Sequence, residues 1–247
     1  MTTAMIVDRV TKRFKVTNSP SIKKLTVNTV KGQRQVKMLE AVKDVSFELE
    51  IGGSIGLCGL NGSGKSTLLK IISGVMEPTS GTVLTRGRIA GLIDVGAGMH
   101  PDLTGRENVF LNAAIFGMGK AETRRKFDEI LDFSGMEELV DSPVYNYSSG
   151  QYMRLAFAVA AHTDCDIFLL DEMLAVGDQP FKRKCMKKIH QLKAEGKTMF
   201  YVSHNPNGIA KLCEHGLVLS RGRMVFYGPA KEAIDWLGYD YDDEEEA

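Results

Sequence analysis

The sequence predicts an α/β fold: a mostly parallel β-sheet covered by helices on both faces, with a helical lobe inserted into it. Short strand-like runs alternate with helix-like runs over most of the 247 residues, which is the order expected of βαβ units. Between about Leu103 and Ala161 the alternation stops, because apolar residues recur at helical spacing and strand-like runs are missing. An N-terminal antiparallel β region completes the predicted architecture.

The individual elements follow from their apolar patterns and turn residues. Strands are expected at VSFELEI (45–51), SIGLC (54–58), DIFLLD (166–171) and TMFYVSH (198–204), and helices at Lys65–Ser73 and Phe181–Ala194. The run GLVLSRGRMVFYG predicts a hairpin that turns at Arg221 and Gly222, because a glycine turn there separates two strand-like halves.

Two helices of the inserted lobe are expected to begin at capping boxes. Thr104 with Glu107, and Ser148 with Gln151, have the spacing at which two side chains satisfy each other's backbone N–H groups. We therefore expect one domain with an internal division. Its core comprises 1–95 and 162–236, its helical subdomain 96–161, and its last residues, 237–247, have the acidic composition typical of a disordered tail.

Composition indicates a cellular compartment for the protein but says little about its partners. Lys+Arg and Asp+Glu are 31 each, so the net charge indicates neither a nucleic acid nor a membrane surface. The four cysteines have no paired spacing, which predicts a reducing compartment, the cytoplasm. No signal peptide is evident, and no apolar run reaches the roughly 20 residues needed to cross a bilayer. If the chain serves a membrane process, it is therefore expected to do so through partners.

The stretch GLNGSGKST, residues 59–67, lies between the strand SIGLC and the next helix. Such a loop aims backbone N–H groups and the positive end of the helix dipole at one point, which suits a phosphate chain. Lys65 would neutralise the β- and γ-phosphates, and the Ser66 hydroxyl would bind Mg²⁺. The residues expected to contact a nucleotide are Gly59, Asn61, Gly62, Ser63, Gly64, Lys65, Ser66 and Thr67. The alternative is a tight glycine turn without chemistry.

A second pair of candidates follows the strand CDIFLLDE. Asp171 and Glu172 come at the carboxyl end of the strand, where open α/β sheets bind ligands. Asp171 would hold Mg²⁺, directly or through water, and Glu172 would orient or deprotonate the attacking water. The alternative is a pair of acids that are merely solvated at the end of a buried strand.

The stretch YSSGQYMRLAFAVAA, residues 147–161, resembles the signature motif, usually LSGGQ, and the following helix of ATP-binding cassette (ABC) ATPases. The order of motifs, from the phosphate loop to IFLLDE, AVGD and YVSH, is similar to that family from end to end. The resemblance implies a RecA-like P-loop NTPase core. It also implies that Ser148, Ser149, Gly150 and Gln151 face the γ-phosphate of ATP held by a second copy, so that ATP closes a homodimer with two composite sites.

The same resemblance implies roles for four further residues. His204 corresponds to the switch histidine, which contacts the γ-phosphate, and Phe14 to the aromatic that stacks on adenine. Asp178 belongs to the loop AVGD of the nucleotide site. The family's magnesium-contacting glutamine is not evident, and Asp94 is the nearest polar candidate for its role. A surface histidine and a core phenylalanine are the alternatives for His204 and Phe14.

The signature departs from the family pattern at two positions. Tyr147 and Ser149 replace the usual leucine and second glycine, and Ser149 adds a side chain where backbone should approach phosphate. We expect turnover to be slow and nucleotide binding to survive. A nucleotide-dependent regulator with low turnover is therefore one alternative function, and a soluble ABC-type ATPase that is not coupled to transport is another.

The stretches LLDEMLAVGDQPFKRKC and DVGAGMHPDLTGREN are similar to one subgroup, the ATPase subunits that export lipid-linked polysaccharides such as O-antigens, teichoic acids and galactan. The resemblance implies an ATP hydrolase at the cytoplasmic face of the membrane, two copies of a polytopic permease as partners, and no nucleic acid. Galactan is the preferred substrate. Because little chain follows Trp236, no C-terminal sugar-binding domain is expected.

Positive charge is concentrated near the N-terminus. Nine basic residues and no acid lie between Asp8 and Glu40. The part from about Val16 to Met38 extends ahead of the first core strand and is a candidate contact for lipid phosphates or for the membrane partner. A solvated surface hairpin is the alternative.

Overall fold

Two β-sheets and a group of helices make up the protein. The structure, a computed structural model, describes residues 3–17, 36–92, 98–171, 178–203 and 205–236. An antiparallel sheet has the strand order β2, β1, β4, and a six-stranded sheet has the order β5, β6, β7, β3, β8, β9. The strands are β1 (Thr3–Thr17), β2 (Val36–Glu50), β3 (Ser54–Cys58), β4 (Ser80–Thr85), β5 (Ile89–Leu92), β6 (Ile167–Leu170), β7 (Thr198–Val202), β8 (His215–Ser220) and β9 (Arg223–Pro229). The predicted α/β class is confirmed.

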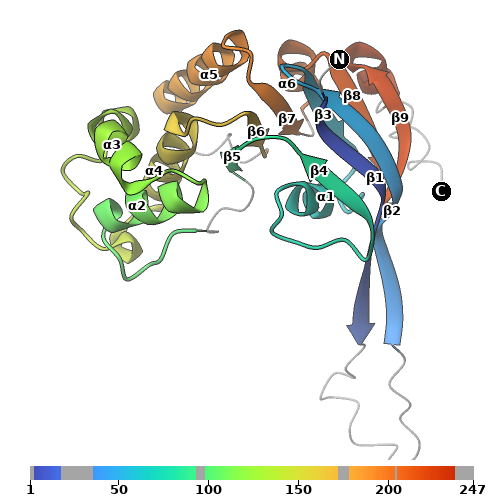
Figure 1. Ribbon diagram of the computed structural model, residues 1–247, viewed down its shortest axis with the longest axis horizontal. Coiled ribbons are helices and arrows are strands. Elements are labelled where there is room, and N and C mark those ends of the chain that lie inside the picture. Colours follow the sequence, from blue (N-terminus) through green and yellow to red (C-terminus); the bar gives the residue numbers. More distant parts are fainter. Residues whose placement is uncertain (1–2, 18–35, 93–97, 172–177, 204, 237–247) are drawn as a thin grey trace, which may run out of the picture.

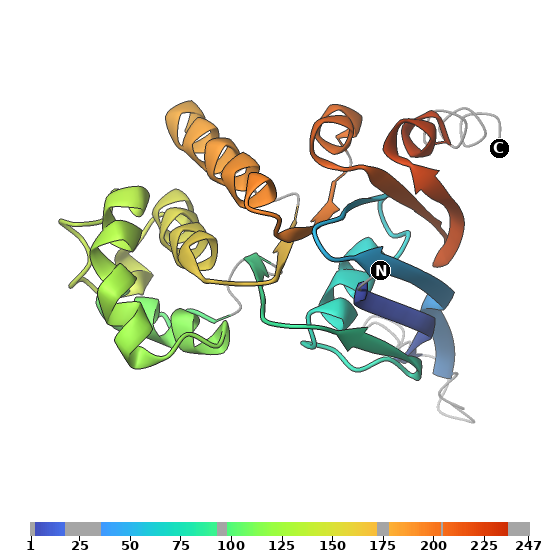
Figure 2. The ribbon, with the colours of Figure 1, turned by 45° about the horizontal axis from the view of Figure 1, so that its top comes forward.

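Some helices lie against the sheets, and others form a separate lobe. They are α1 (Lys65–Ile72), α2 (Gly105–Ile115), α3 (Lys120–Ser134), α4 (Ser149–His162), α5 (Gln179–Ala194) and α6 (Pro206–Leu212), with a 3-10 helix η2 (Val144–Asn146). In both ribbon views α2, α3 and α4 lie to one side of the sheets, whereas α1 lies against β1 and β2 (Figures 1 and 2). Among the described residues, no helix has the length and apolar character needed to cross a bilayer.

The parallel strands bring the ends of distant segments to one edge of the six-stranded sheet. From β5 to β8 every neighbouring pair is parallel, and only β9 runs antiparallel to its neighbour. Gly59 follows β3, Asp171 follows β6 and Ser203 follows β7. Since β3, β6 and β7 are neighbours in the order β6, β7, β3, the chain after each of them leaves at the same edge.

Two hydrophobic cores lie on the two faces of this sheet. Along β6, Ile167 and Leu169 belong to one core, and Phe168 and Leu170 to the other, because successive side chains of a strand point to opposite faces. The first core is shared with α1 and the antiparallel sheet, where Phe47 stacks on Phe200 with ring centroids 5.9 Å apart. The second core is continuous with the helical lobe. All four strand residues are buried, which explains the uninterrupted apolar run in the sequence.

The N-terminal strands form a long antiparallel hairpin. Their register pairs Phe14 with Leu39 and continues to Thr17 and Val36, whereas the pairing of β1 with β4 ends at Thr11. The two strands therefore project beyond the antiparallel sheet as a two-stranded ribbon (Figure 1). The rest of the predicted basic extension, 18–35, and the acidic tail, 237–247, lie outside the described residues.

Both predicted capping boxes are present in the helical lobe. The Thr104 hydroxyl accepts from Glu107 N at 3.2 Å, and the Ser148 hydroxyl accepts from Gln151 N at 3.2 Å. In each case the N3 side chain accepts in return from the backbone N–H of the capping residue. Two of the lobe's helices therefore begin where sequence spacing alone places them. The predicted boundaries of the helical subdomain, 96–161, stay a prediction.

The predicted helices and strands are found, and two strands were missed. The hairpin of β8 and β9 turns at Arg221 and Gly222, as expected. The missed strands are β4 and β5. Most residues of β4 are exposed, so its sequence SGTVLT lacks the apolar alternation that identifies a strand, and β5 has only four residues. Residues 230–236 are also helical.

Candidate active site

The phosphate loop connects β3 to α1 and its conformation requires glycine. Gly59, Gly62 and Gly64 have φ angles of 140°, 80° and 108°, in the region that L side chains disfavour. At Gly59 and Gly64 there is also no room for a side chain. A Cβ at Gly59 would collide with the carbonyl oxygen of Leu219, and a Cβ at Gly64 with that of Ala41. The loop therefore packs closely against strands β8 and β2 on one side.

Lys65, the first residue of α1, is held over the loop. The residue is 9% exposed, and its Nζ donates to the carbonyl oxygens of Gly59 at 2.6 Å and Leu60 at 2.8 Å. Burial lowers the pKa of the Lys65 ammonium, and the neighbouring Cys58 and Asp171 oppose that shift. The amine can donate to a phosphate from this position, because it already reaches over the centre of the loop.

The N-terminus of α1 has no side chain that caps it. The cap position is Gly64, which makes no side-chain hydrogen bond, whereas side chains cap α2, α4 and α5. The first N–H groups of a helix have no partner within the helix. At α1 these groups are therefore directed at the loop with no capping side chain, which is the arrangement that binds an anion.

A cavity of about 370 Å³ adjoins the loop. Its lining residues are Phe14, Leu39, Ala41, Asn61, Gly62, Gly64, Lys65, Ser66, Thr67, Asp171 and Val202. The structure thus brings Phe14 and Asp171, which are distant in sequence, to the phosphate loop. Gly59 and Ser63 do not line the cavity. Ser63 is buried behind the loop, and none of the described residues forms a hydrogen bond with its hydroxyl oxygen.

The hairpin supplies the apolar end of the cavity. Phe14 and Leu39 are opposite each other in the β1–β2 register, so their side chains lie on the same face. Lys12 Nζ lies 5.5 Å from the centroid of the Phe14 ring and also donates to the Glu77 carbonyl. Sequence reasoning missed Leu39. The hydrophobic pair becomes recognisable only once the register of the hairpin is known.

Magnesium ligands are available at the other end of the cavity. The Ser66 hydroxyl and the Asp171 carboxylate both line it, beside Lys65. These are the hard oxygen donors that Mg²⁺ prefers when a phosphate completes its coordination, so the residues fit the ion. Three predicted residues cannot be placed: Glu172, His204 and Asp94 lie outside the described residues.

The signature lies at the start of α4, away from the cavity. Ser148 and Ser149 are exposed, and neither lines the cavity. Ser148 caps the helix with Gln151, so its oxygen accepts from Gln151 N while its own hydroxyl proton can still be donated. Tyr147, which replaces the usual leucine, is accommodated because its hydroxyl donates to Leu139 O at 2.6 Å.

Asp178 links the signature helix to the next helix. Its carboxylate caps α5 by accepting from Phe181 N, and it pairs with Arg154 of α4 at 2.9 Å. The Arg154 guanidinium also lies 5.2 Å from the centre of the Phe181 ring. Asp178 is not among the residues that line the cavity. Its predicted contact with nucleotide stays a prediction.

Fold and site together define a P-loop NTPase, and its α4 begins at an exposed capping box away from the cavity. Comparison with known proteins agrees. The family model described as ABC transporter matches residues 42–175. The chain is 40% identical over 230 residues to "ABC transporter protein AbcA" of Aeromonas salmonicida, covering 93% of this chain and 74% of that protein. The chain belongs to the ABC transporter family, as one of its ATP-binding and ATP-hydrolysing cassettes.

Two further relatives and a solved structure are similar over much of the chain. "O-antigen export system ATP-binding protein RfbB" of Klebsiella pneumoniae is 41% identical, covering 79% of each chain. "Teichoic acids export ATP-binding protein TagH" of Bacillus anthracis is 39% identical over 92% of this chain, which spans 41% of that protein. A dimeric bacterial ABC transporter cassette superposes with a TM-score of 0.73 at 25% identity, covering 92% of this chain and 98% of its own.

Proposed function

We propose that this cassette powers the export of a lipid-linked polysaccharide. The relatives named for O-antigen and teichoic acid export support this substrate class, and they do not favour a soluble ATPase or a regulator. Within the class, galactan is the substrate that the motif resemblance favours. The chain would act at the cytoplasmic face of the membrane, bound to two copies of a permease.

One observation carries the mechanistic part of the proposal. The start of α1 lines the cavity, whereas Ser148 at the start of α4 is exposed and does not line it. A single chain therefore holds half of a composite site. In a head-to-tail pair, Ser148, Ser149 and Gly150 of one copy would complete the γ-phosphate site of the other. Hydrolysis would then remove the group that both copies hold, and the pair would open.

Within each site the residues have separate tasks. Lys65 and the open N-terminus of α1 would bind the triphosphate, and Phe14 with Leu39 would contact the adenine. Ser66 and Asp171 would hold Mg²⁺, which neutralises phosphate charge when bound. We assign Glu172 the activation of water and His204 a contact to the γ-phosphate, and Asp94 the role of the family's missing glutamine.

The substitution Glu172→Gln tests the composite site. With ATP and Mg²⁺ present, this variant should form a stable dimer on gel filtration, while its ATPase rate falls by about 100-fold or more. The double variant with Lys65→Ala should stay monomeric, because it cannot bind the nucleotide that joins the two copies. An E172Q protein that binds ATP as a monomer, or that hydrolyses it at the wild-type rate, would contradict the proposal.

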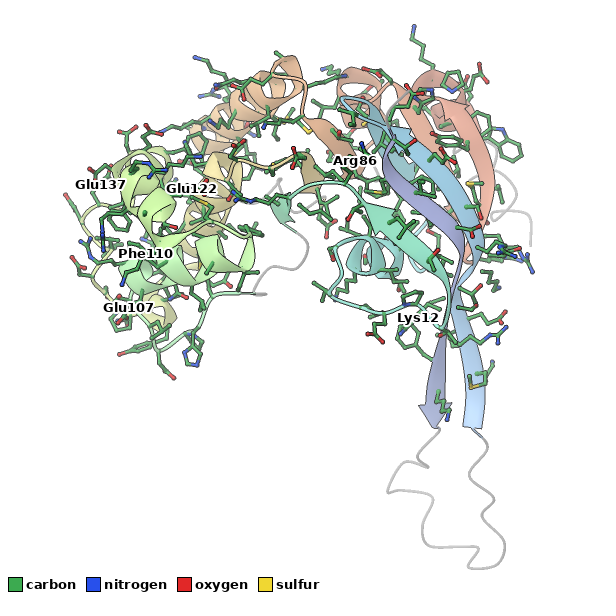
Figure 3. All side chains as sticks on the ribbon, in the orientation of Figure 1. Lys12, Arg86, Glu107, Phe110, Glu122 and Glu137 are labelled. Atoms are coloured by element: carbon green, nitrogen blue, oxygen red, sulfur yellow. The ribbon has the colours of Figure 1, made fainter. Side chains whose placement is uncertain are left out.

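A groove on the helical lobe suits the permease. It measures about 610 Å³ and is lined by Arg106, Glu107, Phe110, Leu111, Ala114, Met118, Lys120, Thr123 and Arg124. Figure 3 shows Phe110 and Glu107 on this lobe, at the opposite side of the molecule from Lys12 of the hairpin. Three of the lining residues are basic and one is acidic, so an amphipathic permease segment with acidic residues beside its apolar face fits the groove.

The groove can be tested without disturbing the nucleotide site. Leu111→Glu places a charge at a half-exposed apolar position of α2. Co-purification with the co-expressed permease should be lost, while the ATPase of the isolated chain stays unchanged. As a control, Leu84→Glu changes an equally apolar but exposed residue of β4 outside the groove, and it should keep the permease. Equal recovery of both variants would rule out this docking surface.

A further inference from the structure

The turn between β8 and β9 connects two parts of the nucleotide site. Arg221 and Gly222 have φ angles of 47° and 84° and form this turn. Gly222 N donates to Ser63 O in the phosphate loop at 2.9 Å, and Gly222 O accepts from Lys43 N of β2 at 2.7 Å. The N–H and the carbonyl of Gly222 therefore connect the phosphate loop to β2 of the N-terminal hairpin.

Position 222 favours glycine for two reasons: its positive φ angle and the lack of room for a Cβ. Gly222 is buried, and a Cβ there would lie 2.9 Å from Ala41 O. The same carbonyl closes the space beside Gly64, so two glycines from different segments pack around Ala41 O. Ala41 also lines the cavity. The packing behind the phosphate loop is therefore continuous with the wall of the site.

The connection matters because the two ends of the cavity belong to different sheets. Lys65 and the loop follow β3 of the six-stranded sheet, whereas Phe14 and Leu39 belong to the antiparallel sheet. No strand of one sheet is hydrogen-bonded as a neighbour to a strand of the other within the described residues. At the site, the hydrogen bond from Lys43 N to Gly222 O crosses from the antiparallel sheet to the β8–β9 turn, and the bond from Gly222 N to Ser63 O continues it to the phosphate loop.

We propose that Gly222 is a positioning residue that sets the register between the phosphate loop and the base-binding pair Phe14 and Leu39. This inference rests on the proposed nucleotide contacts. Neither Arg221 nor Gly222 lines the cavity, so the turn would act through Ser63 on one side and through Lys43 and Ala41 on the other. A ligand that uses both ends of the cavity depends on this register, but a ligand that uses the loop alone does not.

The experiment compares two ligands and three variants of the full chain. Calorimetric titration measures the affinity for ATP and for inorganic triphosphate, which lacks the base. Gly222→Ala adds the colliding Cβ, and Gly222→Asn adds it on a residue that tolerates positive φ. Gly196→Ala is the matched control, because Gly196 has a φ of 80° but no atom within 4 Å of a Cβ.

Both Gly222 variants should bind ATP about tenfold more weakly, as expected for one or two lost or strained hydrogen bonds, and should bind triphosphate as the wild type does. Gly196→Ala should match the wild type for both ligands. Unchanged ATP affinity in the Gly222 variants, or an equal loss for both ligands, would overturn the inference. Failure of the wild type to bind ATP would instead contradict the proposed function.

Discussion

The N-termini of α1 and α4 both carry backbone N–H groups, but they differ in how the helix is capped and in how exposed it is. At α1 the cap is a glycine without a side chain, the adjacent Lys65 is buried, and the helix start lines a cavity. At α4 the cap is Ser148, which is exposed and satisfied by its own capping box. The start of α1 therefore has no capping side chain and faces the cavity, whereas the start of α4 is capped by side chains of its own helix.

This contrast has a physical basis. At α4 the capping box satisfies the backbone N–H groups of Ser148 and Gln151 within the chain, so the exposed helix start is stabilised locally. At α1 no side chain caps the helix, and Lys65 Nζ donates to two carbonyls of the loop, so the first N–H groups of α1 have no capping side chain. The signature residues at the start of α4 are therefore exposed on a helix that is capped within the chain.

The largest expected effect is the loss of Lys65. Lys65→Ala should weaken ATP binding by about 100-fold, because charge-assisted hydrogen bonds to phosphate disappear from a buried position. Lys70→Ala is the control, because Lys70 lies in the last turn of the same helix and does not line the cavity. Equilibrium binding of a fluorescent ATP analogue measures both. Similar affinities for the two variants would show that Lys65 does not hold the phosphates.

The two capping boxes offer a matched pair. Ser148→Ala and Thr104→Ala each remove a 3.2 Å cap and should each lower the free energy of unfolding by ~1 kcal/mol. Only Ser148→Ala should also slow the ATPase, by about tenfold, since the lost hydroxyl would face the partner's phosphate. Chemical denaturation and a steady-state ATPase assay separate the effects. Equal ATPase rates would make Ser148 a helix cap and nothing more.

The pH dependence of ATP affinity should report on Lys65. Burial lowers the pKa of Lys65, so in the free protein it loses its proton at lower pH than an ordinary lysine does. Phosphate favours the charged form. Affinity should therefore be constant below that pKa and fall as pH rises through it, by at most about tenfold per pH unit for one proton. Titrations at several alkaline pH values check this, and Lys65→Arg should flatten the profile. A flat wild-type profile would contradict the assignment.

The smallest effect is expected at the link between α4 and α5. Arg154 and Arg106 each combine an ion pair, to Asp178 and Asp141, with a nearby phenylalanine ring. Arg154→Ala should slow the ATPase of the isolated chain by about threefold, because partly exposed pairs are weak, while Arg106→Ala leaves it unchanged. The free energy of unfolding should change by a similar amount in both variants. A rate that is unchanged by Arg154→Ala would show that Asp178 is positioned by its helix cap alone.

Local features of the site could be predicted from the sequence. The phosphate loop was identified because glycine, lysine and serine occur at fixed spacing between a strand and a helix, and the capping boxes because they span one helical turn. Leu39 could not be identified in this way. Its contribution depends on which residue of β1 lies opposite it, and the register of a hairpin is set over its whole length. The strand β4 was missed because its residues are mostly exposed.

The sequence by itself determined the elements and the chemistry of each motif, because these depend on residues within a few positions of one another. Only the tertiary structure decided which motifs share a cavity. Phe14, Lys65 and Asp171 meet there although the chain between them is long, and Gly222 joins the loop to β2. The physical reason is that parallel strands and sheet packing set these distances, and both depend on contacts between remote segments.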